Sequence, residues 1–354
     1  MTLPAPINPE DLVFHFLNVG FGDNILVEFP VDKTGKRSYA LVDCKDSKKT
    51  KQYLKELMNK RPGKPEFEFV CATHPHADHI SGIDSILEDE TYHVKQFWDS
   101  GFRHKSQTYI KILQSLLLQE IGLIRVSSGM EWYFGKVQVT ALAPSIYLRN
   151  RYATHGVDMN NASIVLRFEH HVEDMMLIRS KEYTGNVSLE AERQAGRSVV
   201  ILAGDAEYDS WSYITEEFPR LERTDSNEPL VKKMVNYLAC SALKVSHHGS
   251  MHSAPLDVYE KMVPETAVIS TEQEESTKQA GDLALKRGLF PHRLAIIALE
   301  ECGAEILTTD GSYESEKKPT PPGSIVMVVP SGGKPRLKRL EDTKTSIPKV
   351  LEEV

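Results

Sequence analysis

Short apolar runs alternate with amphipathic segments along most of the chain. Two segments in the first half carry apolar residues at helical spacing and predict helices, Ser47–Lys60 and Tyr109–Ile121. The apolar runs around them end at Gly, Asp or His and predict buried strands at Val13–Val19, Asn24–Phe29, Tyr39–Val42, Glu66–Ala72 and Val137–Leu142. Strands that alternate with helices are typical of a layered α/β fold.

The second half repeats this alternation. Its predicted strands are Ser163–Phe168, Ser198–Leu202, Ala242–Val245, Thr266–Ser270, Ile306–Thr309 and Ser324–Val329. Two similar halves favour an αββα sandwich. We therefore expect one domain over residues 1–330. Residues 170–197 are polar and charged and predict an exposed insertion, and the charged, proline-broken residues 331–354 predict a flexible tail.

Composition and charge are those of an ordinary soluble globular protein. The 354 residues are 40% hydrophobic and carry a formal net charge of −8. We expect a cytoplasmic protein, because no apolar run could cross a membrane and no secretory signal is visible. The acidic balance disfavours a protein that coats duplex DNA by charge alone. The four cysteines are scattered without a CxxC pair and predict reduced core thiols: Cys44, Cys71, Cys240 and Cys302.

The strongest chemical signal is the segment THPHADH, which directly follows a predicted strand. It places His74, His76, Asp78 and His79 within six residues. Such side chains require polar partners when buried, and a loop after a rigid strand can turn them toward one another. His74 and His76 can hold one ion, and Asp78 and His79 a second. Imidazole and carboxylate ligands suit Zn²⁺ and also accept Mn²⁺ or Fe²⁺.

This segment matches the HxHxDH signature, and the chain resembles the metallo-β-lactamase-fold hydrolase superfamily. The resemblance implies that Asp43, in LVDC, supports the metal loop and that Asp205, in VVILAGD, bridges two metals. In LKVSHHGS it implies that His247 ligates the second metal and that His248 contacts substrate or acts in catalysis. The reverse assignment of these two histidines stays open. Asp78 is a candidate both for ligating a metal and for orienting the attacking water.

The order of the motifs over roughly residues 12 to 330 is similar to one branch, the ComEC-type hydrolase domain, here free-standing and without the membrane channel. Where many superfamily members have a third-motif histidine, this chain has Asn160 and Asn161, whose amide oxygens are weaker ligands. Ser250 follows the histidine pair and is a candidate substrate contact. His292 lies where the branch often shows Gly-His-Pro and is a candidate phosphate contact.

The resemblance implies a hydrolase that uses water activated by one or two Zn²⁺ or Mn²⁺ ions. A phosphodiesterase or nuclease acting on nucleic acid or a nucleotide is the first interpretation, and the basic residues within Lys45–Arg61 are compatible with it. One alternative is hydrolysis of a lactone, thioester or β-lactam. Another is a non-catalytic, metal-stabilised interaction module that docks a protein partner through residues 170–197. The sequence leaves open the native metal, DNA against RNA, endo- or exo-cleavage, and a homo-oligomeric state.

Overall fold

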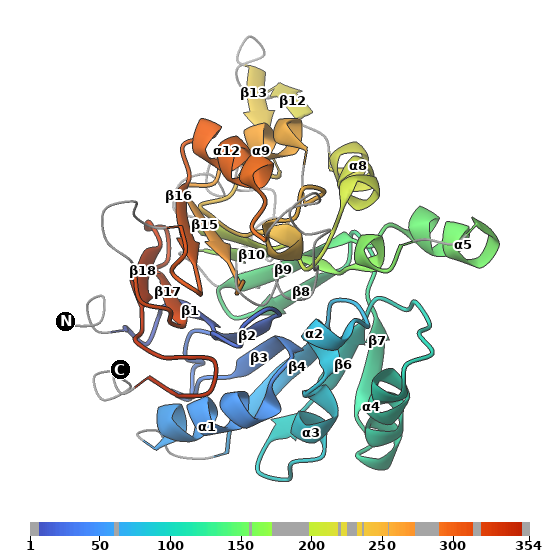
Figure 1. The fold of residues 1–354 in the computed structure, drawn as a ribbon, viewed down its shortest axis with the longest axis vertical. Coiled ribbons are helices and arrows are strands. Elements are labelled where there is room, and N and C mark those ends of the chain that lie inside the picture. The colour runs from blue at the N-terminus through green and yellow to red at the C-terminus, as the bar shows by residue number, and fades with distance from the viewer. Residues whose placement is uncertain are drawn as a thin grey trace, which may run out of the picture.

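Two β-sheets pack face to face in the computed structural model, and helices cover the outer side of each sheet (Figure 1). The structure describes residues 7–59, 64–155, 158–171, 198–218, 221–224, 232–235, 237–253, 255–272, 290–313 and 320–348. Within these residues, every helix is too short or too polar to cross a lipid bilayer.

The first sheet contains most of the N-terminal half and both strands after residue 320. Its strand order is β18-β17-β1-β2-β3-β4-β6-β7, with β5 also paired to β4. Neighbours from β3 to β7 are parallel, and those from β18 to β3 are antiparallel. The strands are β1 (Leu12–Phe16), β2 (Asn24–Glu28), β3 (Tyr39–Cys44), β4 (Glu66–Ala72), β5 (His93–Val94), β6 (Gln96–Asp99), β7 (Gly122–Arg125), β17 (Ile325–Val329) and β18 (Arg336–Arg339).

The second sheet has the order β16-β15-β14-β11-β10-β9-β8. Its strands from β11 to β16 are parallel neighbours, whereas β8, β9, β10 and β11 pair antiparallel. The strands are β8 (Glu131–Phe134), β9 (Val137–Ala143), β10 (Val165–His170), β11 (Ser198–Leu202), β14 (Ala242–Lys244), β15 (Thr266–Ile269) and β16 (Glu305–Thr308). A separate antiparallel pair is formed by β12 (Leu221–Thr224) and β13 (Lys232–Val235).

Helices pack on the outer faces through apolar stripes. On the first sheet lie α1 (Ser47–Met58), α2 (Ala77–Ile80), α3 (Ile83–Leu87) and α4 (Gln107–Leu118). On the second lie α8 (Tyr208–Glu217), α9 (Leu256–Met262) and α12 (Arg293–Glu301), and α5 (Ile146–His155) follows β9. Two short 3₁₀ turns, η1 (Asn160–Ala162) and η2 (Ser246–Gly249), complete the described elements.

Three apolar layers account for this arrangement. The central layer lies between the sheets, where Phe14 of β1 meets Phe168 of β10 edge to face at 5.2 Å between ring centroids. Each outer layer joins one sheet to its helices. Most strands are therefore buried on both faces, which explains why they read as continuous apolar runs and not as alternating ones. The predicted αββα sandwich is confirmed.

Most predicted elements lie within a few residues of the observed ones, and β4 and β11 match residue for residue. The ordered structure continues beyond the predicted domain boundary at residue 330. Residues 336–339 form β18, which pairs with β17, and Asp342 is buried beside Lys49 with 2.5 Å between Oδ2 and Nζ. The predicted insertion begins inside β10, which ends at His170; its residues 172–197 lie outside the described residues, as do 349–354 of the tail.

The cysteines agree with the expectation of reduced thiols. All four are free, and three of them are buried. Burial raises the pKa of Cys44 and of Cys240 to about 12. Because the thiolate is the reactive form, these two side chains are unreactive near neutral pH.

His170 joins the two sheets and makes folding sensitive to acid. Its Nδ1 donates to the carbonyl oxygen of Val329 on β17 at 3.0 Å, and its side chain is fully buried. Burial lowers the pKa of His170 to about 4, whereas an unfolded histidine titrates near ~6.5. Between these values the unfolded chain binds a proton that the folded chain does not, so stability falls as the pH drops through this window.

We therefore expect wild type to lose about 2–3 kcal/mol more unfolding free energy between pH 7 and pH 4.5 than His170→Gln, which keeps a donor but does not titrate. Urea titrations in EDTA at both pH values measure the difference while removing metal as a variable. Equal losses in the two proteins would contradict the assignment.

Candidate metal centre

Four strand ends bring the candidate ligands to one edge of the sandwich. In the first sheet β3 and β4 are parallel, and in the second β11 and β14 are parallel, so within each pair the carboxyl ends lie together. The loops that follow carry Asp78, Asp205 and His248. A backbone bond of 2.9 Å from Ile164 N to Thr73 O links the two sheets at this edge. Residues far apart in sequence therefore meet on rigid supports.

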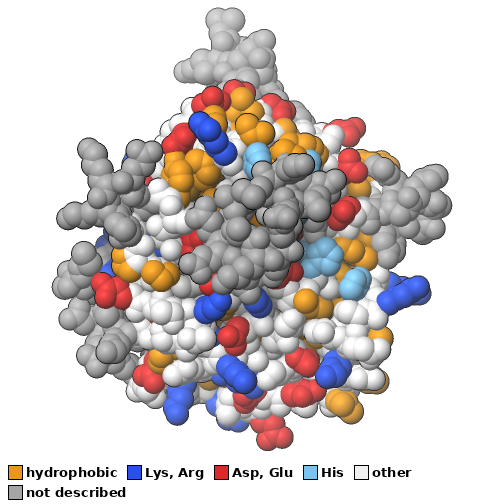
Figure 2. Space-filling view, viewed as in Figure 1, with side chains coloured by type: hydrophobic (Ala, Val, Ile, Leu, Met, Phe, Trp, Pro, Cys, Tyr) orange, Lys and Arg blue, Asp and Glu red, His pale blue; other side chains and the backbone are white. Residues whose placement is uncertain are grey.

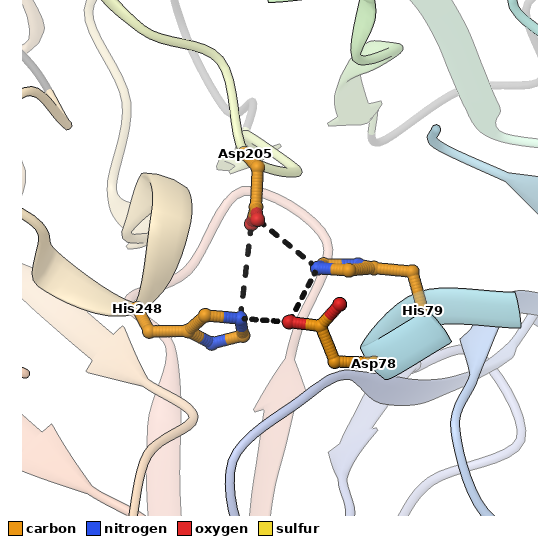
Figure 3. Close-up of side chains that lie close together, drawn as sticks. All are labelled: Asp78, His79, Asp205 and His248. Atoms are coloured by element: carbon orange, nitrogen blue, oxygen red, sulfur yellow. Dashed lines mark ion pairs between the residues drawn. The ribbon is translucent and has the colours of Figure 1, made fainter. Parts of the chain in front are cut away.

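Asp78, His79, Asp205 and His248 form a closed ring of ligand atoms (Figure 3). His79 Nε2 lies 3.2 Å from Asp205 Oδ2 and 3.9 Å from Asp78 Oδ2. His248 Nε2 lies 3.6 Å from Asp78 Oδ2 and 3.9 Å from Asp205 Oδ1. Ligand atoms about 2 Å from a zinc ion are separated by roughly 3.3 Å in tetrahedral geometry. The ring has close to the dimensions that one ion requires.

The outer nitrogen of each ring histidine is already fixed by an acceptor. His248 Nδ1 donates to the carbonyl of Ser270 at 2.7 Å, and His79 Nδ1 lies 2.7 Å from Asp43 Oδ2. The inner Nε2 atoms of both, and Asp205 Oδ1, are buried without a hydrogen-bond partner among the described residues. Unpartnered buried polar atoms are costly, and a metal ligated through Nε2 with Nδ1 held by an acceptor is the usual protein arrangement. These residues fit a metal ion.

His74 and His76 form a second pair of ligands beside this ring. His74 Nε2 lies 3.0 Å from His76 Nδ1 and 3.6 Å from Asp205 Oδ2. The carboxylate of Asp205 thus faces His74 and His79 with one oxygen and His248 with the other. This placement suits a carboxylate shared by two ions.

Asp43 supports the loop from behind. Its Oδ1 accepts from Thr73 N at 2.8 Å, and its Oδ2 accepts from Thr73 Oγ1 at 2.7 Å as well as contacting His79. Asp43 itself adopts a left-handed backbone with φ 58°, which aspartate tolerates better than most residues. One carboxylate therefore fixes both the start of the metal loop and the orientation of a ligand.

The electrostatics of the ring call for a cation. Burial raises the pKa of Asp205, but His79, His248 and His247 outweigh burial and hold it well below its usual range. Burial lowers the pKa of His79, but Asp205, Asp43 and Asp78 outweigh it and raise the pKa well above the usual value. A positive charge at this position, whether a proton or a metal ion, is what these carboxylates stabilise. Metal binding here competes with protonation.

The two neighbouring histidines lie in different surroundings. His248, not His247, belongs to the ring of four ligands. Both residues have left-handed backbones, with φ 45° and 51°, and His248 Nε2 lies 3.9 Å from Asp205 Oδ1. His247 places Nδ1 2.8 Å from Glu207 Oε1 and Nε2 4.0 Å from Asp205 Oδ2. This grouping favours the reverse assignment of the two histidines, which the sequence left open.

The other candidate residues from the sequence form hydrogen bonds in the loops and helices around the ring. Asn160 Nδ2 donates to Glu207 Oε1 at 3.0 Å, and Asn161 Oδ1 accepts from Ser210 N at 3.0 Å in α8. Ser250 Oγ accepts from the backbone of the same loop, and His292 Nδ1 caps α12 by accepting from Leu294 N at 3.2 Å. The substrate contacts expected of Ser250 and His292 stay predictions.

Two buried groups that sequence reasoning did not identify lie directly behind the ring. Lys244 Nζ donates to Asp23 Oδ2 at 2.7 Å, and that oxygen lies 3.9 Å from His79 Nδ1. Burial raises the pKa of Asp23, but Lys244 outweighs it and keeps the carboxylate charged. The available signals were a lysine inside the apolar strand ALKV and the aspartate that ends GFGD. The pair ties the β1–β2 turn to the second sheet.

Gly22 allows this turn to approach the metal loop. A Cβ there would lie 2.5 Å from the backbone oxygen of Asp78, and the residue has φ 141°. Gly35 provides a matched control, because it also has positive φ (79°) but a Cβ added to it would have nothing within 4 Å.

We expect Gly35→Ala to lose about 1–2 kcal/mol from its backbone conformation alone. Gly22→Ala should lose roughly 1–3 kcal/mol more and should weaken metal binding, because the clash displaces Asp78. Urea unfolding and metal titration of both variants test this. Equal stability and equal metal affinity in the two would show that the close approach is unimportant.

Comparisons with known proteins agree with the resemblance stated from the sequence. No protein-family model matches the chain. The chain is 22% identical over 309 residues to ComE operon protein 3 of Bacillus subtilis (strain 168), covering 83% of this chain and 31% of that protein's length. It therefore spans less than a third of that relative.

Solved structures similar to this chain include metallo-β-lactamase-fold proteins. YhfI of Bacillus subtilis matches with 13% identity and a TM-score of 0.38, over 73% of this chain and 85% of YhfI. CmlA of Streptomyces venezuelae, described as a diiron β-hydroxylase, matches with 11% identity and a TM-score of 0.40, over 94% of this chain and 55% of CmlA.

Proposed function

We propose that this chain is a metal-dependent hydrolase of phosphodiester bonds in nucleic acid or a nucleotide, holding one or two Zn²⁺ or Mn²⁺ ions. One observation carries the proposal. Buried ligand atoms of His79, Asp205 and His248 converge at ligand spacing without hydrogen-bond partners among the described residues, while the outer nitrogens of both histidines are fixed by acceptors. A purely structural cluster would satisfy these atoms internally.

The bound ions would supply Lewis acidity and a water acidified to near neutral pH. His79, Asp205 and His248 would hold one ion, with His74 and His76 beside Asp205 at the other. Asp78 is the most exposed member of the ring, with 28% of its side chain accessible, and so can reach both an ion and an attacking water. Its carboxylate remains ionised, because burial is outweighed by His79 and His248, which lower its pKa.

The choice of a phosphodiester rests on the motif resemblance to the ComEC-type branch. Two lysines of α1 are engaged by carboxylates and add no support to it. Lys49 is buried against Asp342, and Lys51 lies 2.8 Å from Asp89. On the face in Figure 2, acidic and basic side chains are interspersed below the central grey atoms. Recognition of phosphate is therefore proposed to come from the ions and not from a basic face.

The proposal predicts metal-dependent turnover of bis-p-nitrophenyl phosphate and of DNA or RNA by the full chain. EDTA should abolish turnover, and added Zn²⁺ or Mn²⁺ should restore it. Asp78→Ala and His76→Ala should each lower kcat/KM by more than about 100-fold, since each removes a metal ligand. The control is Asp257→Asn, an exposed residue of α9 paired with Lys261, which should leave turnover unchanged.

Two results would contradict the phosphodiesterase proposal in different ways. Turnover of lactone, thioester or β-lactam substrates alone would favour the other hydrolase class. Full metal occupancy without turnover of any of these substrates would favour the interaction module.

A further inference from the structure

One side of Asp205 offers three donors to an ion, from His74, His76 and Asp205. Zinc in proteins is usually four-coordinate, with a water in the fourth position of catalytic sites. Asn161 Oδ1 accepts from the α8 backbone, and Asn160 Nδ2 donates to Glu207, while Asn160 Oδ1 is buried without a hydrogen-bond partner among the described residues. The fourth position must be filled by water or by another side chain.

His247 is placed to supply that donor. Its Nε2 lies 4.0 Å from Asp205 Oδ2, the same oxygen that lies 3.6 Å from His74 Nε2. Its other nitrogen, Nδ1, lies 2.8 Å from Glu207 Oε1 as an ion pair, without the geometry of a hydrogen bond. A carboxylate beside the outer nitrogen of a metal-binding histidine helps to orient the ring. His247 therefore lies between the carboxylates of Asp205 and Glu207.

The backbone of His247 adopts a conformation that is uncommon for residues with a side chain. Its φ and ψ are 45° and 48°, a left-handed conformation that costs a residue with a side chain free energy. Its N–H donates to Gly204 O at 3.0 Å, which ties it to the loop that carries Asp205. Strain of this kind persists at sites where a side chain must point in one direction.

Glu207 is itself held from two sides. It is the N-cap residue of α8, and its Oε1 accepts from Asn160 Nδ2 at 3.0 Å. The four residues form a continuous chain of contacts from Asn160 through Glu207 and His247 to Asp205. Asn160 is thus connected to Asp205 through Glu207 and His247.

We propose that His247, oriented by Glu207, is the fourth ligand of the ion held by His74, His76 and Asp205. Both histidines of the HHGS segment then serve the centre, one at each ion. Glu207 acts as a positioning residue, and Asn160 positions Glu207. The inference rests on the metal centre of the proposed function, but not on the identity of the substrate.

Metal binding by the full chain tests this without any substrate. The stripped protein is titrated with Zn²⁺ against a chromophoric chelator and with Co²⁺ by absorption, in wild type, His247→Asn, Glu207→Gln and Asp209→Asn. Asparagine tolerates the left-handed backbone but cannot replace the imidazole. Asp209 lies in the first turn of α8, close to Glu207 in sequence, and serves as the matched control.

Wild type should bind two ions per chain. In His247→Asn, the affinity for one ion should fall about 100-fold and the Co²⁺ band of that ion should change, with the other ion unaffected. Glu207→Gln should lower the affinity for the same ion by about 10- to 100-fold. Asp209→Asn should behave as wild type, and the thermal midpoint of the metal-free variants should match that of wild type.

A wild type that binds one ion only, or a His247→Asn variant that binds both ions with wild-type affinity and spectrum, would overturn the proposal. So would an equal loss of both ions in His247→Asn. If metal binding follows the expected pattern but no phosphodiester is cleaved, the proposed substrate fails while this ligand assignment stands.

Discussion

The central constraint on this structure is the buried negative charge of Asp205, which histidines from both sheets compensate. The carboxylate stays ionised inside the protein because imidazoles from two separate loops surround it, and a buried charge persists only when it is compensated. The loop after β4 supplies His79, and the loop after β14 supplies His248. Closing the sandwich therefore adds His79 of the first sheet to the histidines that the second sheet already places beside this charge.

Polar ties hold the same edge in register. The buried ion pair of Lys244 with Asp23 connects the second sheet to the first β-turn, and Asp43 fixes the loop that begins at Thr73. Each of these contacts is directional, so it fixes the position of one segment relative to another more narrowly than an apolar contact would. The apolar layer between the sheets provides most of the stabilisation, and these few contacts determine the geometry at its edge.

Sequence reasoning succeeded where structure is local. The strand Glu66–Ala72 could be predicted, and the candidate ligands after it could be identified, because an apolar run, a strand end and four potential ligand side chains lie within fourteen residues. The layer architecture followed from the same alternation. The order of motifs then indicated which distant aspartate would face the loop.

It failed where the deciding contact is distant or conformational. The roles of His247 and His248 depend on two consecutive left-handed residues, which their identities do not predict. The segment RLKR of β18 has no apolar alternation, yet pairing with β17 makes it a strand. Glu207 and Lys49 look like surface charges until their partners, Asn160 and Asp342, are brought to them by the fold.

The pairing of β1 with β17 has a consequence for synthesis on the ribosome. Leu12 lies opposite Val329, so β1 emerges more than three hundred residues before the strand that it pairs with. Contacts of such sequence separation form late, because closing the intervening loop is entropically costly. Until residues 325–339 emerge, one edge of β1 is exposed, and that edge is the one that nascent-chain chaperones have most reason to shield.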